Sequence, residues 1–268
     1  MKRLIIFIVI FFSVRTALGF ERIVSLAPQA TEILYSLGLG QKIVGVTTFC
    51  NRPEDAKKKP KIGGMSNPSL EAIIALKPDI VVMTTDGNPE WVEERLRDFG
   101  IRTYVIRARR IAELPGELRE IGKALGVREH SEELAKEIER EIASYRGGHS
   151  RGRAIFIIWP EPLIVAGPGT AIDDAMRLVG LKNIAEGAAI NYPKYSVEET
   201  IKSDPEIIII GSAPGMEGYS KGLLKKLSRT TAVKRGNVFF VSDNLYRLGP
   251  RIIDGIRELD DISKRVKR

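Results

Sequence analysis

Two glutamates, Glu71 and Glu198, occupy the same position in a sixteen-residue sequence that occurs twice in the chain. Residues 69–84 read SLEAIIALKPDIVVMT and residues 196–211 read SVEETIKSDPEIIIIG, so the two copies align without a gap. A carboxylate in the first turn of a helix is favourable near the positive end of the helix dipole, which could explain either glutamate alone. Two acidic side chains in equivalent positions would also suit docking onto a partner with two basic sockets, because complementary charges fix the register of an interface.

Each copy of the repeat has a proline between a helical pattern and a short apolar run. Proline cannot continue a helix and moves the preceding residue out of the α region. The isoleucines and valines that follow are typical of a strand buried on both faces. Each copy therefore predicts a helix–proline–strand unit, and Asn67 is expected to cap the first helix with Pro68 at its first position. The repeat indicates two similar lobes.

Patterns for catalysis and for metal binding are missing from the sequence. The two histidines, His130 and His149, are nineteen residues apart, whereas a metal site needs clustered donors. The single cysteine, Cys50, has no histidine beside it in sequence to act as its base, and it excludes an intrachain disulfide. There is no G-x-S-x-G, no Gly-Lys-Ser/Thr phosphate loop and no GxGxxG after a strand. The sequence therefore predicts a protein that is not an enzyme and that has no metal site and no cofactor.

The first nineteen residues have the pattern of a secretory signal peptide. Lys2 and Arg3 precede an apolar run, and the small residues 17–19 predict cleavage before Phe20. The apolar run is shorter than the roughly 20 residues that a membrane-spanning helix needs. Secretion across the cytoplasmic membrane predicts a periplasmic or cell-surface protein. Cleavage lowers the net charge from +8 to +5, because it removes three basic residues and no acid.

Strand and helix patterns alternate in residues 20–110, the predicted N-terminal lobe, and again in residues 149–268, the predicted C-terminal lobe. Such alternation predicts an α/β fold with two Rossmann-like lobes and mainly parallel sheets. Residues 111–148 are helical in pattern apart from a turn near Gly126, and they predict a long connecting helix between the lobes. We expect a ligand cleft between the lobes, because open α/β sheets bind ligands beyond the carboxyl ends of their strands.

Composition limits the partners that the chain can have. With 43% apolar and 28% charged residues it is an ordinary globular protein. No basic block is interleaved with aromatic residues, so a nucleic acid is not an expected partner. A monomer is expected.

Aromatic and polar residues occur in the segments that follow the predicted strands. Aromatic rings in such loops can wall a pocket for a large planar ligand, or they can pack in a lobe core. Polar residues at the strand ends could contact the same ligand, although Asp243 could instead cap the segment that follows it. The aromatic candidates are Phe49, Trp159 and Tyr192, and the polar candidates are Asp86, Asp243 and Asn244.

Several short stretches of the mature chain carry a resemblance to a known family. They are RIVSLAP at residues 22–28, TE at 31–32, GGM at 63–65, LE at 70–71, LKPD at 76–79, GN at 87–88, SD at 242–243 and PRII at 250–253. Together they resemble the helical-backbone substrate-binding proteins of ABC importers, which bind cobalamin, haem or iron–siderophores. Within that family the chain is most similar to the cobalamin-binding members. The resemblance covers the whole mature chain.

The resemblance implies roles for particular residues. In this family two glutamates dock onto arginines of the membrane permease, and Glu71 and Glu198 match them. The cobalamin pocket of the family is walled by aromatic residues, and Asp243 matches a residue that accepts hydrogen bonds from corrin amides. Ile62 and Thr84 stand where the family has further aromatic wall residues, so the pocket is expected to be less aromatic and could take a different corrinoid or another chelate. By position, the remaining wall residues are Phe49, Trp159 and Tyr192.

The sequence therefore predicts an extracytoplasmic substrate-binding protein that captures a corrinoid, with cobalamin as the first candidate, and delivers it to the permease subunits of an ABC importer. Haem or an iron–siderophore is the alternative within the family, and a two-lobed α/β enzyme is a further alternative that the fold alone does not exclude. A siderophore would need several basic residues that face an anionic chelate. The candidates, which could equally be solvated or paired, are Arg107, Arg109, Arg110 and Arg247.

Overall fold

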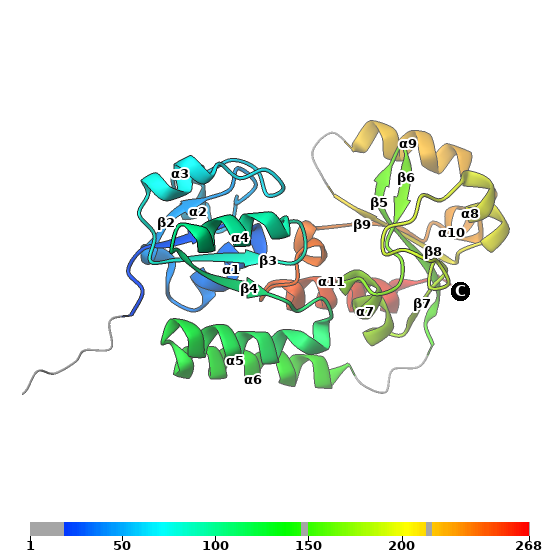
Figure 1. Cartoon of the computed structure of the whole chain (residues 1–268). Helices are drawn as coiled ribbons and strands as arrows, with labels where there is room; N and C mark the ends of the chain where they lie inside the picture. The colour runs from blue at the N-terminus through cyan, green and yellow to red at the C-terminus, as the bar shows by residue number, and fades with distance from the viewer. Residues whose placement is uncertain (1–18, 146–149, 213–215, 268) are drawn as a thin grey trace, which may run out of the picture.

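Two α/β lobes lie side by side in the computed structural model of the chain, which describes residues 19–145, 150–212 and 216–267 (Figure 1). Residues 1–18 of the predicted signal peptide lie outside the described residues. His149 also lies outside them. Within the described part of the chain, no helix has the length and apolar character needed to cross a membrane.

The N-terminal lobe is built on a four-stranded sheet in which every pair of strands is parallel. The strand order is β2-β1-β3-β4, so the chain crosses over the sheet through helices, as the alternating pattern predicts. The strands are β1 (Ile23–Ser25), β2 (Ile43–Val46), β3 (Ile80–Thr84) and β4 (Arg102–Ile106). The helices are α1 (Pro28–Ser36), η1 (Gly40–Lys42), α2 (Glu54–Lys57), α3 (Leu70–Ala75) and α4 (Glu90–Asp98).

The C-terminal lobe repeats this plan with one antiparallel addition. Strands β6, β5, β8 and β9 are neighbours in that order, β7 also pairs with β5, and only the β5–β6 pair is antiparallel among the described strands. The predicted α/β fold with mainly parallel sheets is confirmed. The strands are β5 (Gly152–Pro160), β6 (Leu163–Val165), β7 (Leu181–Asn183), β8 (Ile207–Gly211) and β9 (Val238–Val241). The helices are α7 (Ala171–Leu178), α8 (Val197–Ser203), α9 (Glu217–Lys226), α10 (Thr231–Arg235), η3 (Asp243–Tyr246) and α11 (Ile252–Arg265).

The connecting segment is a pair of helices rather than one straight rod. After η2 (Ile111–Glu113), α5 (Leu114–Leu125) and α6 (Arg128–Ser144) fold back on each other and run side by side beneath the N-terminal lobe (Figure 1). The turn between them is at Gly126, which ends α5 with a left-handed φ of 76°. A Cβ at Gly122 would lie 1.9 Å from the hydroxyl of Ser131, so the absence of a side chain lets the two helices approach.

The two lobes share one apolar core. Alternate residues of each strand face opposite sides of a sheet, and the inner faces of both sheets belong to a single cluster with α5, α6, α7 and α11. Residues of β1 such as Ile23 and of β5 such as Phe156 are therefore parts of one core. The outer faces form separate clusters, with Val24 in the N-terminal lobe and Ile155 in the C-terminal lobe. Because burial of this shared surface stabilises both lobes at once, we expect their relative motion to be small.

The repeat has the same backbone in both lobes. Ser69 and Ser196 are the N-caps of α3 and α8, and their hydroxyls accept hydrogen bonds from the amides of Ala72 and Glu199 at 3.1 Å and 2.9 Å. The predicted cap at Asn67 is therefore wrong by two positions. The serine caps because it immediately precedes the helix, whereas Pro68 still pairs with Gly63 in an isolated bridge.

Candidate functional site

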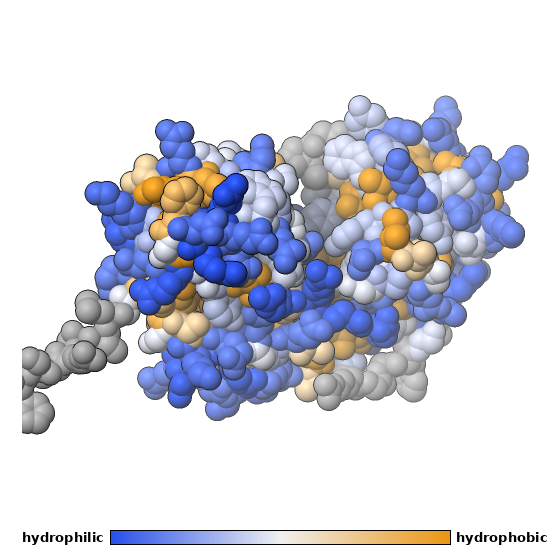
Figure 2. All heavy atoms as spheres, in the orientation of Figure 1, coloured by the Kyte–Doolittle hydropathy of each residue, from blue (hydrophilic) through white to orange (hydrophobic). Residues whose placement is uncertain are grey.

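A cavity of about 280 Å³ lies between the lobes, at the carboxyl ends of the strands (Figure 2). From the N-terminal lobe it is lined by a residue of α1 and by the segments that follow β3 and β4. From the C-terminal lobe it is lined by the start of α7, the loop at residues 191–192 and the segment around η3. The predicted cleft between the lobes is present. Its lining includes Gln29, Asp86, Arg109, Asn191, Tyr192 and Tyr246.

Two of the predicted site residues, Asp86 and Tyr192, meet at this cavity from opposite lobes. The side chain of Tyr192 is about half exposed, at 48%. Desolvation and, to a lesser degree, the negative charge of Asp86 raise the pKa of the Tyr192 phenol. The phenol is therefore neutral near pH 7 and can donate a hydrogen bond to a ligand.

Tyr246 is a cavity residue that the predicted site does not contain. Its ring packs edge-to-face on Phe156 with the centroids 6.2 Å apart, and its hydroxyl donates to the carbonyl of Ile158 at 3.4 Å. Burial, followed by the charge of Asp243, raises the pKa of Tyr246 to about 12. A Cβ at Gly211 would lie 1.7 Å from the Tyr246 hydroxyl. The glycine that ends the second repeat, where the first has threonine, leaves the space that this tyrosine fills.

Thr84 and Ile62 are buried and are not among the residues that line the cavity, so their role as wall residues stays a prediction. Thr84 is 1% exposed, and its hydroxyl accepts a hydrogen bond from the side-chain amide (Nε2) of Gln29 at 3.0 Å. Ile62 is also 1% exposed and belongs to the outer core of the N-terminal lobe together with Val24 and Ile73. Both are buried because their segments run beside strands of the sheet, and the side chains fill the space between that sheet and its helices.

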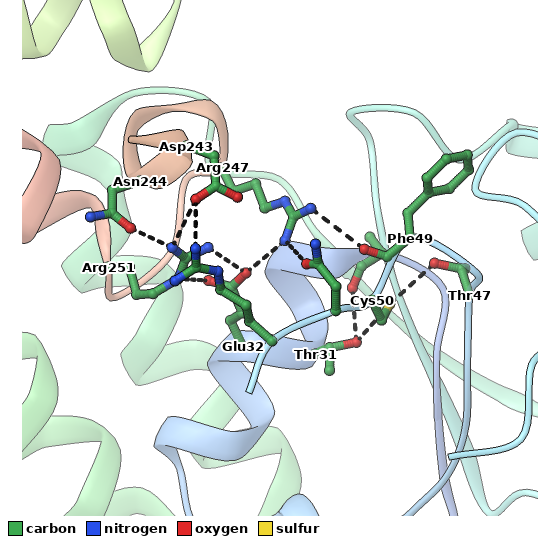
Figure 3. A network of polar contacts seen from close by, with 12 residues as sticks. Thr31, Glu32, Thr47, Phe49, Cys50, Asp243, Asn244, Arg247 and Arg251 are labelled. Carbon is green, nitrogen blue, oxygen red and sulfur yellow. Dashed lines mark hydrogen bonds and ion pairs between the residues drawn. The ribbon is translucent and has the colours of Figure 1, made fainter. Parts of the chain in front are cut away.

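The other two predicted aromatic residues, Phe49 and Trp159, are not among the residues that line the cavity. Trp159 lies near the end of β5, donates its indole N–H to the carbonyl of Glu161 at 2.7 Å, and packs against the outer core of its lobe. Phe49 is 58% exposed, and its ring points away from the ion pairs beside it (Figure 3). Phe49 therefore remains available to a ligand, whereas Trp159 has a packing role.

A buried carboxylate joins the two lobes beside the cavity (Figure 3). Glu32 of α1 is only 5% exposed and accepts from Arg247 at 3.0 Å and from Arg251 at 2.8 Å and 2.9 Å. Both arginines belong to the segment between β9 and α11, which also contributes Tyr246 to the cavity. The ion pairs therefore hold a ligand-site segment of the C-terminal lobe against α1 of the N-terminal lobe.

Asp243 and Asn244 belong to this network and are not among the residues that line the cavity, so their contact with a ligand stays a prediction. Asp243 pairs with Arg52 at 3.1 Å and with Arg251 at 3.5 Å, and the amide oxygen of Asn244 accepts from Arg251. The turn of η3 brings both side chains to arginines that satisfy them. Asp243 thus helps to hold the segment in place through its arginine partners, whereas the N-cap of η3 is Ser242, whose hydroxyl accepts from the backbone amide of Asn244.

The four arginines proposed for an anionic chelate have different surroundings. Arg110 forms two hydrogen bonds with Asp174 of α7, at 2.7 Å and 2.5 Å, and Arg247 is paired with Glu32. Arg107 and Arg109 are exposed, and neither forms an ion pair with a residue that the structure describes. Arg109 is the one of the four that lines the cavity.

Glu71 and Glu198 are the second residues of α3 and α8, one on each lobe (Figure 1). Both are exposed, and neither is ion-paired within the described part of the chain. Each helix is held at its end by an arginine at the start of the first strand of its lobe, immediately before β1 for Arg22 and within β5 for Arg153. Arg22 donates to the carbonyl of Leu76 at 2.6 Å, and Arg153 donates to that of Ser203 at 2.8 Å, which is the equivalent position of the repeat.

Donors for a metal do not gather anywhere in the described residues, where no group of three or more His, Cys, Asp and Glu side chains is close enough to hold an ion. Cys50 is buried and hydrogen-bonds with the hydroxyls of Thr31 and Thr47, both at 3.1 Å. It is a packed residue of the shared core.

Comparisons with known proteins agree with this architecture. The periplasmic binding protein family matches residues 23–245. A vitamin B12-binding protein of Pectobacterium carotovorum subsp. carotovorum strain PC1 is 30% identical over 199 residues, which cover 72% of each chain. YvrC of Bacillus subtilis, an uncharacterized ABC transporter substrate-binding lipoprotein, is 30% identical over 250 residues, which cover 89% of this chain and 78% of YvrC. The solved periplasmic haem-binding protein RhuT of Roseiflexus sp. RS-1 has a TM-score of 0.80 at 26% identity, over 91% of this chain and 100% of RhuT.

The family match extends from β1 into η3 and so includes both sheets, the helical connector and all of the cavity lining except Tyr246 and Leu248. The chain therefore belongs to the periplasmic binding protein family.

Proposed function

We propose that this protein binds a corrinoid outside the cytoplasm, with cobalamin as the first candidate, and delivers it to an ABC importer. The observation that carries the choice of ligand is the charge of the cavity, where Asp86 and Arg109 have opposite signs and the other lining residues are uncharged. A corrin ring carries neutral amide side chains, which suit the amides and phenols of the lining. The vitamin B12-binding relatives support this choice.

An anionic chelate fits the same surroundings less well. A ferric siderophore or a haem with two propionates would favour an excess of positive charge in the cavity. Arg110 and Arg247 cannot supply it without leaving the carboxylates that they bind, Asp174 and Glu32. Breaking either pair would leave a largely buried charge without a partner, which is costly.

The size of the cavity indicates how a large ring would bind. At about 280 Å³ it is slightly smaller than the roughly 300–1,000 Å³ of ordinary ligand pockets, so it encloses part of a corrinoid while the rest lies against the walls of the groove. Two large apolar side chains outside the cavity lining are exposed. Phe49 is 58% exposed and Ile190, next to the lining residue Asn191, is 59% exposed. Covering such surface is the expected source of affinity.

Titration of the mature protein with cyanocobalamin is expected to show one-to-one binding with a Kd at or below about 1 μM, in the range that preformed sites reach. Calorimetry measures the stoichiometry and affinity, and tryptophan fluorescence follows the same titration independently. Cyanocobalamin that gives neither heat nor a fluorescence change at concentrations well above 1 μM would contradict the ligand assignment. The family membership would still stand.

Haem is the second candidate, because Tyr192 brings a phenol to the cavity and phenolates are known ligands of haem iron. The haem-binding name of RhuT points the same way. Against it, both desolvation and the charge of Asp86 disfavour the phenolate of Tyr192, because they raise its pKa. The corrinoid therefore remains our proposal.

Replacing Tyr192 with phenylalanine separates the two ligands. For cyanocobalamin we expect a loss of less than about tenfold in affinity, because a neutral hydrogen bond contributes about 1 kcal/mol. A Tyr246→Phe variant is the matched control, since its hydroxyl already donates to the carbonyl of Ile158. Haemin titrations followed by absorbance test the alternative. A phenolate–iron band that disappears in Tyr192→Phe but persists in Tyr246→Phe would favour haem over the corrinoid.

Delivery to a permease rests on the two exposed glutamates. Glu71 and Glu198 are presented on separate lobes by helices with the same caps, as a partner with two basic sockets would require. The substrate-binding name of YvrC, a relative from an ABC transporter, supports such a partner. We propose that these two side chains dock the loaded protein on the importer.

A further inference from the structure

The loop that carries Arg109 is fixed by carboxylates that bind its backbone. The amides of Arg107 and Ala108 donate to Glu117 at 2.8 Å and 3.0 Å. The amides of Arg109 and Arg110 donate to Glu113 at 2.8 Å and 3.1 Å. Glu113 and Glu117 belong to η2 and α5, so the turn after β4 is held rigidly against the start of the connector.

The hydrogen bonds to Glu113 and Glu117 involve only backbone amides, so they do not engage the guanidinium of Arg109, which lines the cavity. The neighbouring Arg110 is bound to Asp174 across the lobe junction, whereas Arg109 forms no side-chain hydrogen bond or ion pair with any residue in the described part of the chain. Asp86 lines the same cavity but is not within ion-pair distance of Arg109. A rigid backbone therefore presents to the ligand a guanidinium that has no ion-pair partner within the described part of the chain.

The chemistry of this group selects one part of a corrinoid. A guanidinium has a planar set of donors that matches phosphate or carboxylate oxygens. The corrin ring bears neutral amides, and the anionic group of a complete corrinoid is the phosphodiester in its nucleotide loop. The cavity is also too small for the whole ligand and suits a protruding part of it. Resting on the proposed corrinoid function, we propose that Arg109 binds this phosphodiester and makes the site selective for corrinoids with a nucleotide loop.

The test compares two ligands and three proteins by calorimetry. Cyanocobalamin has the phosphodiester and dicyanocobinamide lacks it, while the ring is shared. We expect Arg109→Gln to raise the Kd for cyanocobalamin at least tenfold, since hydrogen bonds to charged groups are the stronger ones. The Kd for dicyanocobinamide should change less than twofold. Arg107→Gln, which removes an exposed arginine two residues away and outside the cavity lining, should change neither Kd.

The outcomes distinguish this inference from the proposed function. If wild-type protein binds neither corrinoid, the proposed function fails before any variant is measured, and this inference fails with it. If wild-type protein binds and Arg109→Gln weakens both ligands equally, or neither, the corrinoid function stands and the phosphodiester contact is wrong. Haemin is titrated in parallel: if Arg109→Gln weakens haemin binding but neither corrinoid, the anion that Arg109 receives is a carboxylate, and the proposal is also wrong. Thermal unfolding of each variant checks that its fold is unchanged.

Discussion

Uptake is expected to be abolished when Glu71 and Glu198 are both replaced by arginine, while the affinity for the ligand stays within about twofold of the wild type. The physical reason is that both side chains are exposed on helices outside the cavity lining, so they can contact a partner without touching the ligand. Reversal of two charges turns attraction to a basic socket into repulsion, and like charges at an interface cost several kcal/mol. Transport of labelled cyanocobalamin measures uptake, and calorimetry measures affinity.

The control must make the same change of charge elsewhere. Glu90 and Glu129 are also exposed and also lie in the first turn of a helix, in α4 and α6. The Glu90→Arg plus Glu129→Arg variant should therefore transport normally. The single variants Glu71→Arg and Glu198→Arg should each show partial loss. Failure of ligand binding in the Glu71 and Glu198 double variant, or an equal loss of uptake in the control, would show that these glutamates do not dock.

Replacing Glu32 with alanine should destabilise the protein by about 3 kcal/mol, in the range measured for breaking a buried ion pair. The carboxylate is 5% exposed and holds two arginines whose side chains are about one fifth exposed. Its removal leaves the largely buried guanidinium of Arg247 without an ion-pair partner among the described residues and that of Arg251 with Asp243 alone, at 3.5 Å. For a chain of this size the expected fall in Tm is roughly 10 °C, which calorimetry of the mature protein would measure. Ligand affinity should fall too, because the released segment carries Tyr246.

Two further variants make this result interpretable. Glu32→Gln keeps an acceptor oxygen and the shape of the side chain, so it should lose less stability than alanine. Glu21 pairs with Lys42 at 3.0 Å but is 67% exposed, and Glu21→Ala should cost less than about 1 kcal/mol, as surface pairs do. If Glu32→Ala and Glu21→Ala unfolded at the same temperature, the network in Figure 3 would not hold the lobes together.

The fold was predictable because local patterns and tertiary packing agree over most of the chain. The apolar runs that follow the prolines of the repeat form β3 and β8, and the glycine at position 126 marked the turn of the connector. The elements that the sequence did not predict are short and lie in segments rich in proline, glycine or polar residues. The helix α2 has four residues, and β6 and β7 have three each. Their formation depends on neighbouring strands and not on their own sequence.

The site was less predictable, because its side chains are directed by partners far away in the chain. Asp86 and Tyr192 were predicted and line the cavity, since they follow strands whose carboxyl ends face the other lobe. Asp243 follows a strand equally well, yet it is drawn away by Arg52, which is 191 residues distant in sequence. No pattern in a single sequence reveals such a pairing. Tyr246 was missed for the same reason, because a turn of η3 and the space at Gly211 place it.

The two copies of the repeat also differ in a way that bears on how the protein could evolve. Lys77 and Asp204 occupy the same place and have left-handed φ values of 45° and 39°, a conformation that costs about 1 kcal/mol for a residue with a side chain. At this end of the unit, beside α3 and α8, the two lobes retain a common backbone. At the other end, toward the cavity, Thr84 is replaced by Gly211 and the surroundings have diverged. Under the docking role proposed for Glu71 and Glu198, substitutions at the cavity end would alter the cargo while the docking surface stays unchanged, so specificity and delivery would be separable in inheritance.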